Sequence, residues 1–267
     1  MVKLLEGKYV AEKIKEKIKL DIQSLKQAPV LASILVGDNP GADAYVKSQA
    51  KTACSLGIEY KLYQLAGNIS ENELIGLISK LNMDKTVNGI VVQMPLPQHI
   101  DYKKVSGLIS AKKDIEGMHS SSCTASAVME LLNSTGIDLY GKEVVVVGHS
   151  EIVGKPLALL LLEKFATVTI CHIGTSYAGK LEEHVGKAEV LIVAVGQAGL
   201  IKGEWIKEGA IVVDVGINHQ GGKIVGDVGF EAAEKRASFI TPVPGGVGPL
   251  TVVILMRNLV EAAKLQQ

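Results

Sequence analysis

The sequence predicts an α/β protein of two domains, each built on a mainly parallel sheet flanked by helices. Short runs of β-branched residues alternate with amphipathic segments along the 267 residues, which is the pattern of β-α-β units. The length allows one large domain or two of modest size. A charged stretch at residues 112–116 passes into a serine-rich one and interrupts the alternation. We therefore expect the domain junction around residues 112–126.

Each element follows from its local pattern. Strands are expected where a short apolar run is bounded by turn-forming or polar residues: Val30–Leu35, Tyr60–Leu65, Gly89–Val92, Glu143–Val147, Thr167–Cys171, Val190–Val193, Ile211–Val215 and Ser238–Ile240. Helices are expected where apolar residues recur at helical spacing: Ala11–Ser24, Ala44–Leu56, Glu71–Leu81, Ala125–Leu132, Pro156–Lys164 and Leu250–Lys264. Because the strand Glu143–Val147 is almost continuously apolar, it fits a strand covered on both faces. This predicts a Rossmann-like second domain.

Composition excludes several classes of protein. Lys plus Arg equals Asp plus Glu, 28 against 28, so overall charge favours neither nucleic acid nor an anionic membrane. The three cysteines form no C-x-x-C pair and the six histidines show no metal-ligand spacing, so we expect no disulfide framework and no metal. There is no nucleophile elbow. Charges recur through the first eight residues, which argues against a signal peptide or membrane span and predicts a cytoplasmic protein.

A glycine-containing turn at residues 148–156 follows the valine-rich strand and opens a helix. Backbone N–H groups at such a helix N-terminus can bind a pyrophosphate. Ser150 occupies the place of the second glycine in the usual fingerprint, so the turn alone is a weak signal; a strand after one helix strengthens it. We expect the cofactor at Gly148, His149, Ser150, Ile152 and Val153.

The end of the next strand bears on the choice between NAD and NADP. NAD-selective sites usually place Asp or Glu there, whereas this chain has Cys171-His172-Ile173-Gly174-Thr175. The missing acid, with His149, Lys155 and His172 nearby, favours a 2′-phosphate and hence NADP. NAD stays an alternative because no arginine is present to bind that phosphate.

Later strand ends extend the same predicted site. Val195-Gly196 and Gly216-Ile217 each end an apolar strand, and the carboxyl ends of parallel strands are where open α/β sheets bind ligands. With Ile173, these residues complete the expected cofactor site. The loop 241–249 is rich in Pro and Gly, and its backbone can approach a flat ligand closely.

The first domain offers fewer polar candidates. Gln93 ends a buried strand ahead of two prolines, and a buried amide is expected either to bond its own backbone neighbours or to face a polar ligand. Asp114 and Glu116 alternate along an extended segment, where a solvated loop or a helix cap is the simpler interpretation. Tyr45 stands on an expected helix, where a single tyrosine is usually packing.

Together these segments resemble the methylenetetrahydrofolate dehydrogenase/cyclohydrolase family over nearly the whole chain. The motifs that carry the resemblance are Val91–Pro97, Lys113–Gly117, Gly148–Pro156, Gly203–Ala210 and Thr241–Pro249. The resemblance implies a folate domain of residues 1–120 plus 249–267, an NAD(P) domain of residues 121–248, a folate cleft between them and a homodimer. It also implies oxidation of 5,10-methylenetetrahydrofolate to 5,10-methenyltetrahydrofolate and then hydrolysis to 10-formyltetrahydrofolate.

The resemblance also assigns site residues. Tyr45 would border the folate, Gln93 would assist at the reacting carbon and Glu116 would hold the pterin edge, with position 49 as the fourth catalytic position. Further substrate contacts would come from Val92, Met94, Pro244, Gly245, Gly246, Val247 and Gly248.

The chain departs from the family at position 49. Family members carry a lysine one helical turn after the tyrosine, and this chain has Gln49. Lys47 and Lys51 are expected to lie about 160° to 200° away around the helix, so neither is a simple replacement. The other departures are Glu116 for aspartate, Ala42 for serine, Ser122–Ala125 for Pro-Cys-Thr-Pro, and a shortened stretch between His119 and Cys123.

The two family reactions make different demands on position 49. Hydride loss from a carbon between two nitrogens is driven by their lone pairs, so the protein mainly positions the reactants. Hydrolysis needs an activated water, and loss of general acid–base help costs about 100-fold to 10,000-fold. The sequence therefore predicts an NADP-dependent dehydrogenase with weak or absent cyclohydrolase activity. The alternatives are a fully bifunctional enzyme using Lys47 or Lys51, and an inactive paralogue that binds folate or nucleotide.

Overall fold

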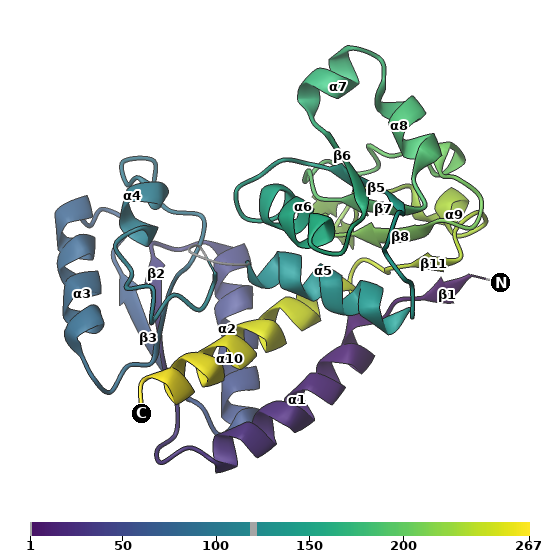
Figure 1. The fold of residues 1–267 in the computed structure, drawn as a ribbon. Coiled ribbons are helices and arrows are strands. Elements are labelled where there is room, and N and C mark those ends of the chain that lie inside the picture. The colour runs from purple at the N-terminus through teal and green to yellow at the C-terminus, as the bar shows by residue number, and fades with distance from the viewer. Residues whose placement is uncertain (1, 118–121) are drawn as a thin grey trace. The chain divides into compact units, whose positions relative to one another are not determined.

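The computed structural model describes residues 2–117 and 122–267, and the chain divides into two compact units. The six-stranded unit consists of Met1–Glu12 and Thr124–Thr251, and the three-stranded unit consists of Lys13–Cys123 and Val252–Gln267. Three helices contribute residues to both units: α1 (Gly7–Gln23), α10 (Val247–Leu265) and, by its first residue alone, α5 (Cys123–Ser134). Each unit is therefore assembled from two separate stretches of chain (Figure 1).

The three-stranded unit is built on a parallel sheet in the order β3-β2-β4. Its strands are β2 (Val30–Val36), β3 (Glu59–Leu65) and β4 (Gly89–Val92). Because strand side chains alternate between faces, even-numbered residues of β2 pack with α3 (Glu71–Met83), while Leu35 packs with α2 (Pro40–Leu56). Every residue of β2 is buried, as expected for a central strand covered on both faces.

The sequence also sets where the helices of this unit begin and end. The Asn39 side chain accepts hydrogen bonds from the Gly41 and Ala42 amides, Pro40 is the first residue of α2, and Gly57 ends it in the left-handed conformation at φ 77°. Ser70 and Glu73 form a capping box at the start of α3. These are the residue types that helix termini favour. A short helix, α4 (Tyr102–Ser106), follows β4.

The six-stranded unit has a parallel sheet in the order β1-β11-β8-β7-β5-β6. The strands are β1 (Lys3–Leu4), β5 (Glu143–Val147), β6 (Thr167–Cys171), β7 (Val190–Val193), β8 (Ile211–Asp214) and β11 (Phe239–Ile240). Its helices include α5 (Cys123–Ser134), α6 (Gly154–Leu162), α7 (Ile173–Tyr177), α8 (Leu181–Lys187) and α9 (Phe230–Ala233), with a 3-10 turn at Gly203–Trp205. The predicted Rossmann-like second domain is confirmed.

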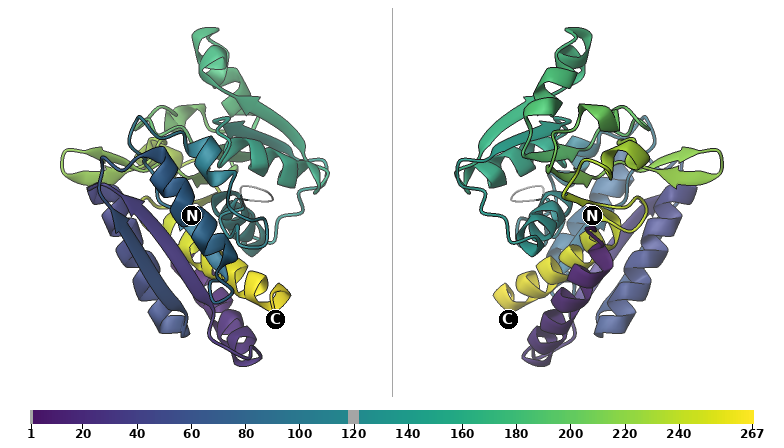
Figure 2. Two further views of the ribbon diagram at one scale, coloured as in Figure 1. Left: turned by 90° about the vertical axis from the view of Figure 1, so that its left-hand side faces the viewer. Right: turned by 90° about the vertical axis from the view of Figure 1, so that its right-hand side faces the viewer.

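Three features of the fold differ from the sequence-based expectation. Residues 1–12 were placed in the first domain, but they belong to the six-stranded unit because Lys3 and Leu4 pair with Phe239 and Ile240. Strand β1 was not predicted, because Lys3 and Leu4 are both exposed and two residues are too few to show a strand pattern. An antiparallel hairpin, β9 (Asn218–Gln220) with β10 (Lys223–Val225), was also not predicted. The hairpin is a two-stranded sheet of its own and projects from the rest of the six-stranded unit (Figure 2). The units change at Cys123/Thr124 and Thr251/Val252, rather than at residues 120/121 and 248/249.

No helix in the described parts of the chain is long and apolar enough to cross a membrane.

Candidate functional site

In the three-stranded unit, four polar side chains meet between the sheet and α2. They are Ser33 on β2, Tyr60 on β3, Gln93 after β4 and Gln49 on α2. The Gln93 Nε2 group donates to Ser33 Oγ at 2.8 Å and to Gln49 Oε1 at 2.8 Å. The Tyr60 hydroxyl donates to the same Gln49 oxygen at 3.0 Å. Gln49, Ser33 and Gln93 are all buried, so Gln93 is indeed a buried amide with partners inside the protein.

Tyr45 lies one turn before Gln49 on α2, so the two side chains share a face of the helix. Burial, together with the negative charge of Glu116, holds the pKa of the Tyr45 phenol well above its usual range. Burial and the same carboxylate also raise the pKa of the Cys123 thiol. Tyr45, Cys123 and Glu116 therefore lie close enough to influence one another, and the first two stay protonated at neutral pH.

Glu116 is the titratable group of this cluster. The residue is only partly exposed, and burial, reinforced by the charge of Asp114, raises the pKa of its carboxyl group to about 7. The segment before it is held firmly: the Ile90 amide donates to the Lys113 carbonyl, and Asn258 Nδ2 on α10 donates to the Ile115 carbonyl. Glu116 can thus exchange a proton near neutral pH from a fixed position.

Lys113 anchors the same segment to α3. Its buried ammonium donates to the carbonyls of Leu81 at 2.7 Å and Asp84 at 2.6 Å. These carbonyls lie at the C-terminal end of the helix, where a cation is favourable. Burial lowers the pKa of Lys113. Its role in the described structure is to hold the backbone that carries Glu116.

The turn after β5 has the shape expected for close approach of a phosphate. Gly148 has φ 122°, and a Cβ atom there would lie 2.3 Å from the Ala194 carbonyl oxygen; at Gly154 it would lie 2.1 Å from the Gly148 carbonyl oxygen. The N-cap residue of α6, Val153, supplies no side-chain cap. Ser150 already accepts from the Val153 amide through its hydroxyl and from the Lys155 amide through its carbonyl, so the fit to a pyrophosphate rests on the closely packed glycines at the start of a helix.

His149 and His172 come together beside this turn. They follow β5 and β6, and their ring centroids are 5.2 Å apart. His172 Nδ1 accepts a hydrogen bond from the Gly174 amide. Both histidines are exposed, and Lys155 pairs with Glu151 at 2.6 Å. Lys155 therefore forms an ion pair with Glu151, whereas His149 and His172 are the basic side chains that meet at the ends of β5 and β6.

Two buried carboxylates that were not predicted from the sequence organise the other loops that are expected to bind the cofactor. Asp227 Oδ2 accepts from the amides of Val195 (2.8 Å) and Gly196 (3.0 Å), and its Oδ1 accepts from Asn218 Nδ2 at 2.9 Å. Asp214 accepts from the amides of Gly216, Asp227 and Val228. Burial raises the pKa of Asp214 to about 6, against these amide hydrogen bonds.

Two glycines of these loops lie so close to the carboxylates that no side chain could replace them without a shift. A Cβ atom on Gly216 would lie 2.2 Å from Asp227 Cγ, and one on Gly226 would lie 2.0 Å from Asp214 Oδ2. Two features of the sequence could have indicated these carboxylates. Asp214 is an acid at the end of an apolar strand, and Asp227 follows a glycine in the pair Gly226-Asp227.

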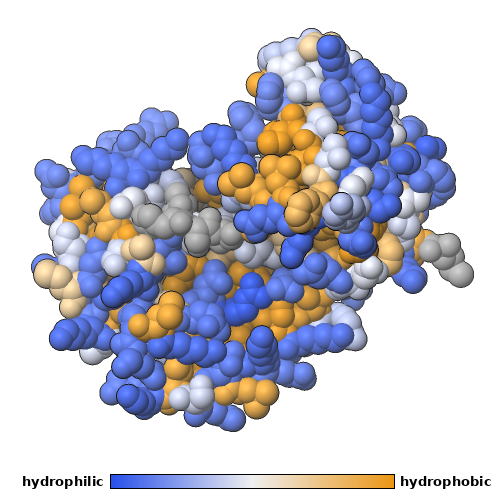
Figure 3. Space-filling view, viewed as in Figure 1, coloured by the Kyte–Doolittle hydropathy of each residue, from blue (hydrophilic) through white to orange (hydrophobic). Residues whose placement is uncertain are grey.

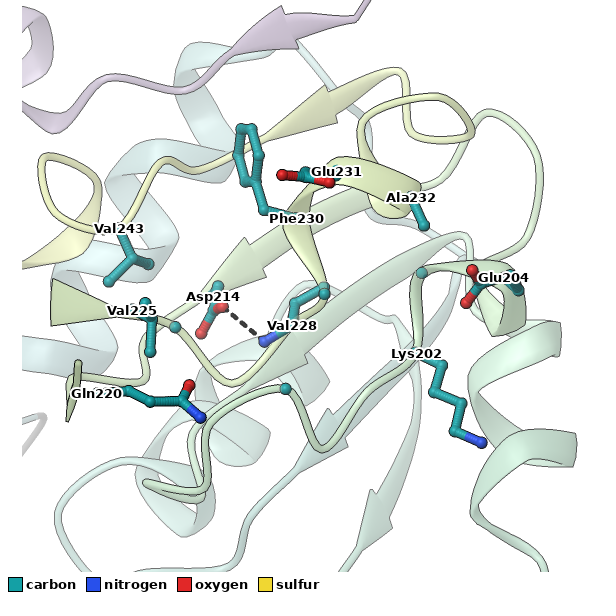
Figure 4. A pocket seen from close by; sticks show the side chains of 14 residues that line it. Lys202, Glu204, Asp214, Gln220, Val225, Val228, Phe230, Glu231, Ala232 and Val243 are labelled. Atoms are coloured by element: carbon teal, nitrogen blue, oxygen red, sulfur yellow. Dashed lines mark hydrogen bonds between the residues drawn. The ribbon is translucent and has the colours of Figure 1, made fainter. Parts of the chain in front are cut away.

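A cavity of about 540 Å³ lies in the same unit beside these carboxylates. Figure 4 shows the Asp214 carboxylate accepting from the Val228 amide in its wall, with Phe230, Glu231 and Lys202 around it. None of the residues predicted from the sequence to bind cofactor or substrate lines this cavity.

The remaining predicted residues have varied positions. The Val92 side chain packs in the hydrophobic cluster on the α3 side of its sheet, opposite to α2, whereas Met94 is 44% exposed. Pro244–Gly248 belong mostly to the loop before α10, and the Gly245 carbonyl accepts from the Gly7 amide. Lys47 and Lys51 are exposed, while Gln49 is fully buried. His119 and the serines at 120–121 lie outside the described residues. Residues 2–117 and 122–267 contain no group of three His, Cys, Asp or Glu able to hold a metal.

Comparison with known proteins supports one family over both units. A tetrahydrofolate dehydrogenase/cyclohydrolase catalytic-domain model matches residues 5–116, and the NAD(P)-binding-domain model of the same name matches residues 122–267. The bifunctional protein FolD of Acetivibrio thermocellus is 48% identical over 99% of this chain and 98% of its own, and that of Bacillus subtilis is 45% identical over 98% and 97%.

Solved structures agree. A bifunctional FolD methylenetetrahydrofolate dehydrogenase/cyclohydrolase from Campylobacter jejuni is 45% identical, covers 100% of both chains and superposes with a TM-score of 0.96. A FolD from Trypanosoma brucei, solved with NADP and an inhibitor, is 35% identical over 99% of this chain and 98% of its own, with a TM-score of 0.94. The chain belongs to the tetrahydrofolate dehydrogenase/cyclohydrolase family.

Proposed function

We propose that the protein oxidises 5,10-methylenetetrahydrofolate to 5,10-methenyltetrahydrofolate with NADP. The observation that carries the proposal is the polar cluster on the α2 face of the three-stranded sheet. There Tyr45 and Gln49 lie on one helix face, and Gln93 is bonded to Gln49. Family membership and the closely packed glycines of the turn at Gly148–Gly154 support the cofactor class.

In this proposal the protein positions the reactants and supplies no general base. When bound, NADP would accept a hydride, which carries the electron pair of the broken C–H bond, while the lone pairs of the flanking nitrogens stabilise the positive charge left on the one-carbon unit. Tyr45 borders the folate as a protonated phenol, Gln93 orients the reacting carbon, and the Glu116 carboxylate accepts hydrogen bonds from the pterin edge. The geometry of these groups then determines the rate.

A second candidate function adds hydrolysis to 10-formyltetrahydrofolate. It is supported by the relatives, which are named bifunctional at 44–48% identity, and these names favour it over the weak cyclohydrolase predicted from Gln49. Against it, Gln49 cannot take a proton from water. Lys47 and Lys51 do not replace the family lysine, because both are exposed. An inactive paralogue finds no support in the retained cofactor turn.

The preference for NADP rests on His149 and His172. Two exposed imidazoles 5.2 Å apart at the ends of β5 and β6 offer N–H donors to a 2′-phosphate. No carboxylate stands at that strand end to bind a ribose 2′-hydroxyl. A cytoplasmic location is also part of the proposal, since Cys54, Cys123 and Cys171 are free thiols, which fits a reducing compartment.

A time course with purified protein separates the candidate functions. The protein is mixed with 5,10-methylenetetrahydrofolate and NADP, then NAD, and methenyl and formyl products are measured against an enzyme-free control. Methenyl product that hydrolyses at the control rate supports the dehydrogenase alone, and rapid formyl production supports both activities. Gln49→Lys is expected to raise hydrolysis about 100-fold or more. If hydrolysis by Gln49→Lys equals that of the wild type, the role assigned to position 49 is wrong.

We also propose that the enzyme is a homodimer. Strand β6 is an unpaired edge of the six-stranded sheet, and α6 beside it exposes Leu159 (64%) and Leu162 (52%), with Phe165 following. Figure 3 shows apolar side chains gathered over this helix. Exposed apolar patches and sheet edges favour association. Leu159→Glu is expected to give a monomer in sedimentation velocity, whereas Leu20→Glu, at an exposed leucine on α1, is expected to leave the dimer intact.

A further inference from the structure

The amide of Gln49 is held in one orientation by two donors on the same atom. Gln49 Oε1 accepts from the Tyr60 hydroxyl at 3.0 Å and from Gln93 Nε2 at 2.8 Å. Gln93 Nε2 has its second hydrogen engaged by Ser33 Oγ at 2.8 Å. Turning the Gln49 amide over would bring its NH2 group against the NH2 group of Gln93. With the Gln93 amide in this orientation, the network keeps the Gln49 oxygen on the sheet side.

The other end of this amide lies near the Tyr45 phenol but makes no hydrogen bond of good geometry. Gln49 Nε2 is the one buried side-chain nitrogen or oxygen among the described residues that makes no hydrogen bond, and the residue is fully buried. Tyr45 is its neighbour one turn away: the Gln49 amide lowers the pKa of that phenol, against the larger effect of burial. Buried polar groups normally have partners, so an orphaned donor beside a substrate-binding residue indicates a ligand atom that accepts from it.

We propose that Tyr60 is a positioning residue that keeps the Gln49 NH2 group directed at a lone-pair acceptor of the bound folate, a carbonyl oxygen or ring nitrogen. The proposal rests on the proposed function. It assigns a role to a residue outside all of the motifs that carry the family resemblance. It also gives Gln49 a chemical direction: its oxygen is occupied twice, so the side chain faces the substrate only as a donor and offers water no acceptor.

The strand itself supplies a matched control. Tyr60 and Tyr63 both lie on β3 and are both half-buried. Because they are three residues apart they face opposite sides of the sheet: Tyr60 packs with the cluster of α2, and Tyr63 packs with the cluster of α3. Tyr→Phe at each position removes one hydroxyl and keeps the ring, so only the change at Tyr60 removes one of the two donors that hold the Gln49 amide.

The test is a double-mutant cycle on the dehydrogenase reaction, using Tyr60→Phe, Gln49→Met, the double variant and Tyr63→Phe. Tyr60→Phe is expected to raise KM for 5,10-methylenetetrahydrofolate about 3-fold to 10-fold, the usual effect of one hydrogen bond, with KM for NADP unchanged. In the Gln49→Met background the same change is expected to have no further effect. Tyr63→Phe is expected to behave as the wild type. An unaltered KM in Tyr60→Phe, or a full effect that persists beside Gln49→Met, overturns the proposal.

A direct observation of the amide gives an answer independent of turnover. The side-chain NH2 resonances of Gln49, identified by their loss in Gln49→Met, are expected to shift when 5-formyltetrahydrofolate is added to the 15N-labelled wild type. The absence of a shift on a ligand that binds overturns the donor role. Failure of the wild type to oxidise 5,10-methylenetetrahydrofolate would instead contradict the proposed function. Thermal melting of each variant establishes that it is folded.

Discussion

A buried carboxyl group at position 116 couples folding and binding to pH in opposite directions. Its pKa rises from 4.5 in the unfolded chain to about 7 in the folded protein, because of burial and then the charge of Asp114. Between these values the folded state holds a proton that the unfolded state has lost, so stability falls as pH rises. In the proposed function the ionised form is the better acceptor for pterin N–H groups. The protonation state that favours folate binding in this proposal is thus the less stable one.

This predicts two pH profiles that Glu116→Gln should flatten. In the wild type, kcat/KM for the folate is expected to rise as pH increases through about 7, since kcat/KM reports the free enzyme. The free energy of unfolding is expected to fall by an amount on the order of 1 to 3 kcal/mol between pH 4.5 and 7. Urea titrations across that range measure the second quantity. A wild-type stability curve that matches Glu116→Gln would show that the carboxyl group is not perturbed.

Single residues also mark the limit of what the sequence reveals. Gln93 could be recognised as a buried amide, because it ends an apolar strand. Gln49 could be recognised only through the family resemblance. Tyr60 and Ser33 could not, since each lies in an ordinary strand and acquires a partner only when β2, β3 and α2 come together. The contacts of a long-range network are absent from local patterns.

At the scale of elements, the loops proposed to bind the cofactor are held by a carboxylate, Asp227, that is not itself proposed to contact the cofactor. Asp227 joins the loop after β7 to Asn218 after β8 through three hydrogen bonds. Asp227→Asn puts an NH2 group where the carboxylate accepted from N–H donors, which costs about 1 to 3 kcal/mol. We expect KM for NADP to rise about 10-fold, with KM for the folate unchanged. Glu163→Gln, at the exposed end of α6, serves as the control. An equal rise in both constants would indicate a general loss of structure instead.

Most elements could be predicted because their signals are local. Strands with β-branched runs and helices with caps, such as Ser70 with Glu73, match the structure within a few residues. The N-terminal strand escaped because it has two residues and depends on β11 for its pairing. The hairpin β9–β10 escaped because its strands have three residues each and little apolar character. The missed strands are thus short ones, and of these only the N-terminal strand depends on a partner distant in sequence.

At the scale of the whole molecule, α10 contributes core residues that complete the three-stranded unit. Leu259 is fully buried, and its side chain lies so close to Gly89 that a Cβ atom there would be 2.7 Å from Leu259 Cδ1. Asn258 and Gln266 bond the backbone of the same region. Leu259→Ala is expected to lower the free energy of unfolding by about 2 to 5 kcal/mol, measured in urea. Leu265→Ala, on the same helix but 85% exposed, should change it little.

The presence of two α/β domains could be predicted from the sequence, but the residues at which the units change differ from the prediction. The alternation of strands and helices indicated two α/β domains, and the family resemblance indicated a returning C-terminal helix. The crossing of α1 at Glu12/Lys13 left no mark, because a continuous amphipathic helix looks alike on both sides of a boundary. The unit to which a helical residue belongs depends on the residues it packs against, and the amphipathic pattern does not identify those residues.

The composite construction of the three-stranded unit has a consequence for synthesis on the ribosome. Its sheet is finished at Val92 and its first stretch ends at Cys123, but the helix that covers Gly89 and Ile115 begins to contribute only at Val252. At about 5 to 20 residues per second, translation of the intervening chain takes on the order of 10 seconds. During that interval the nascent sheet carries an uncovered apolar face. The order in which the gene encodes these segments therefore makes this half of the protein a candidate client for chaperones.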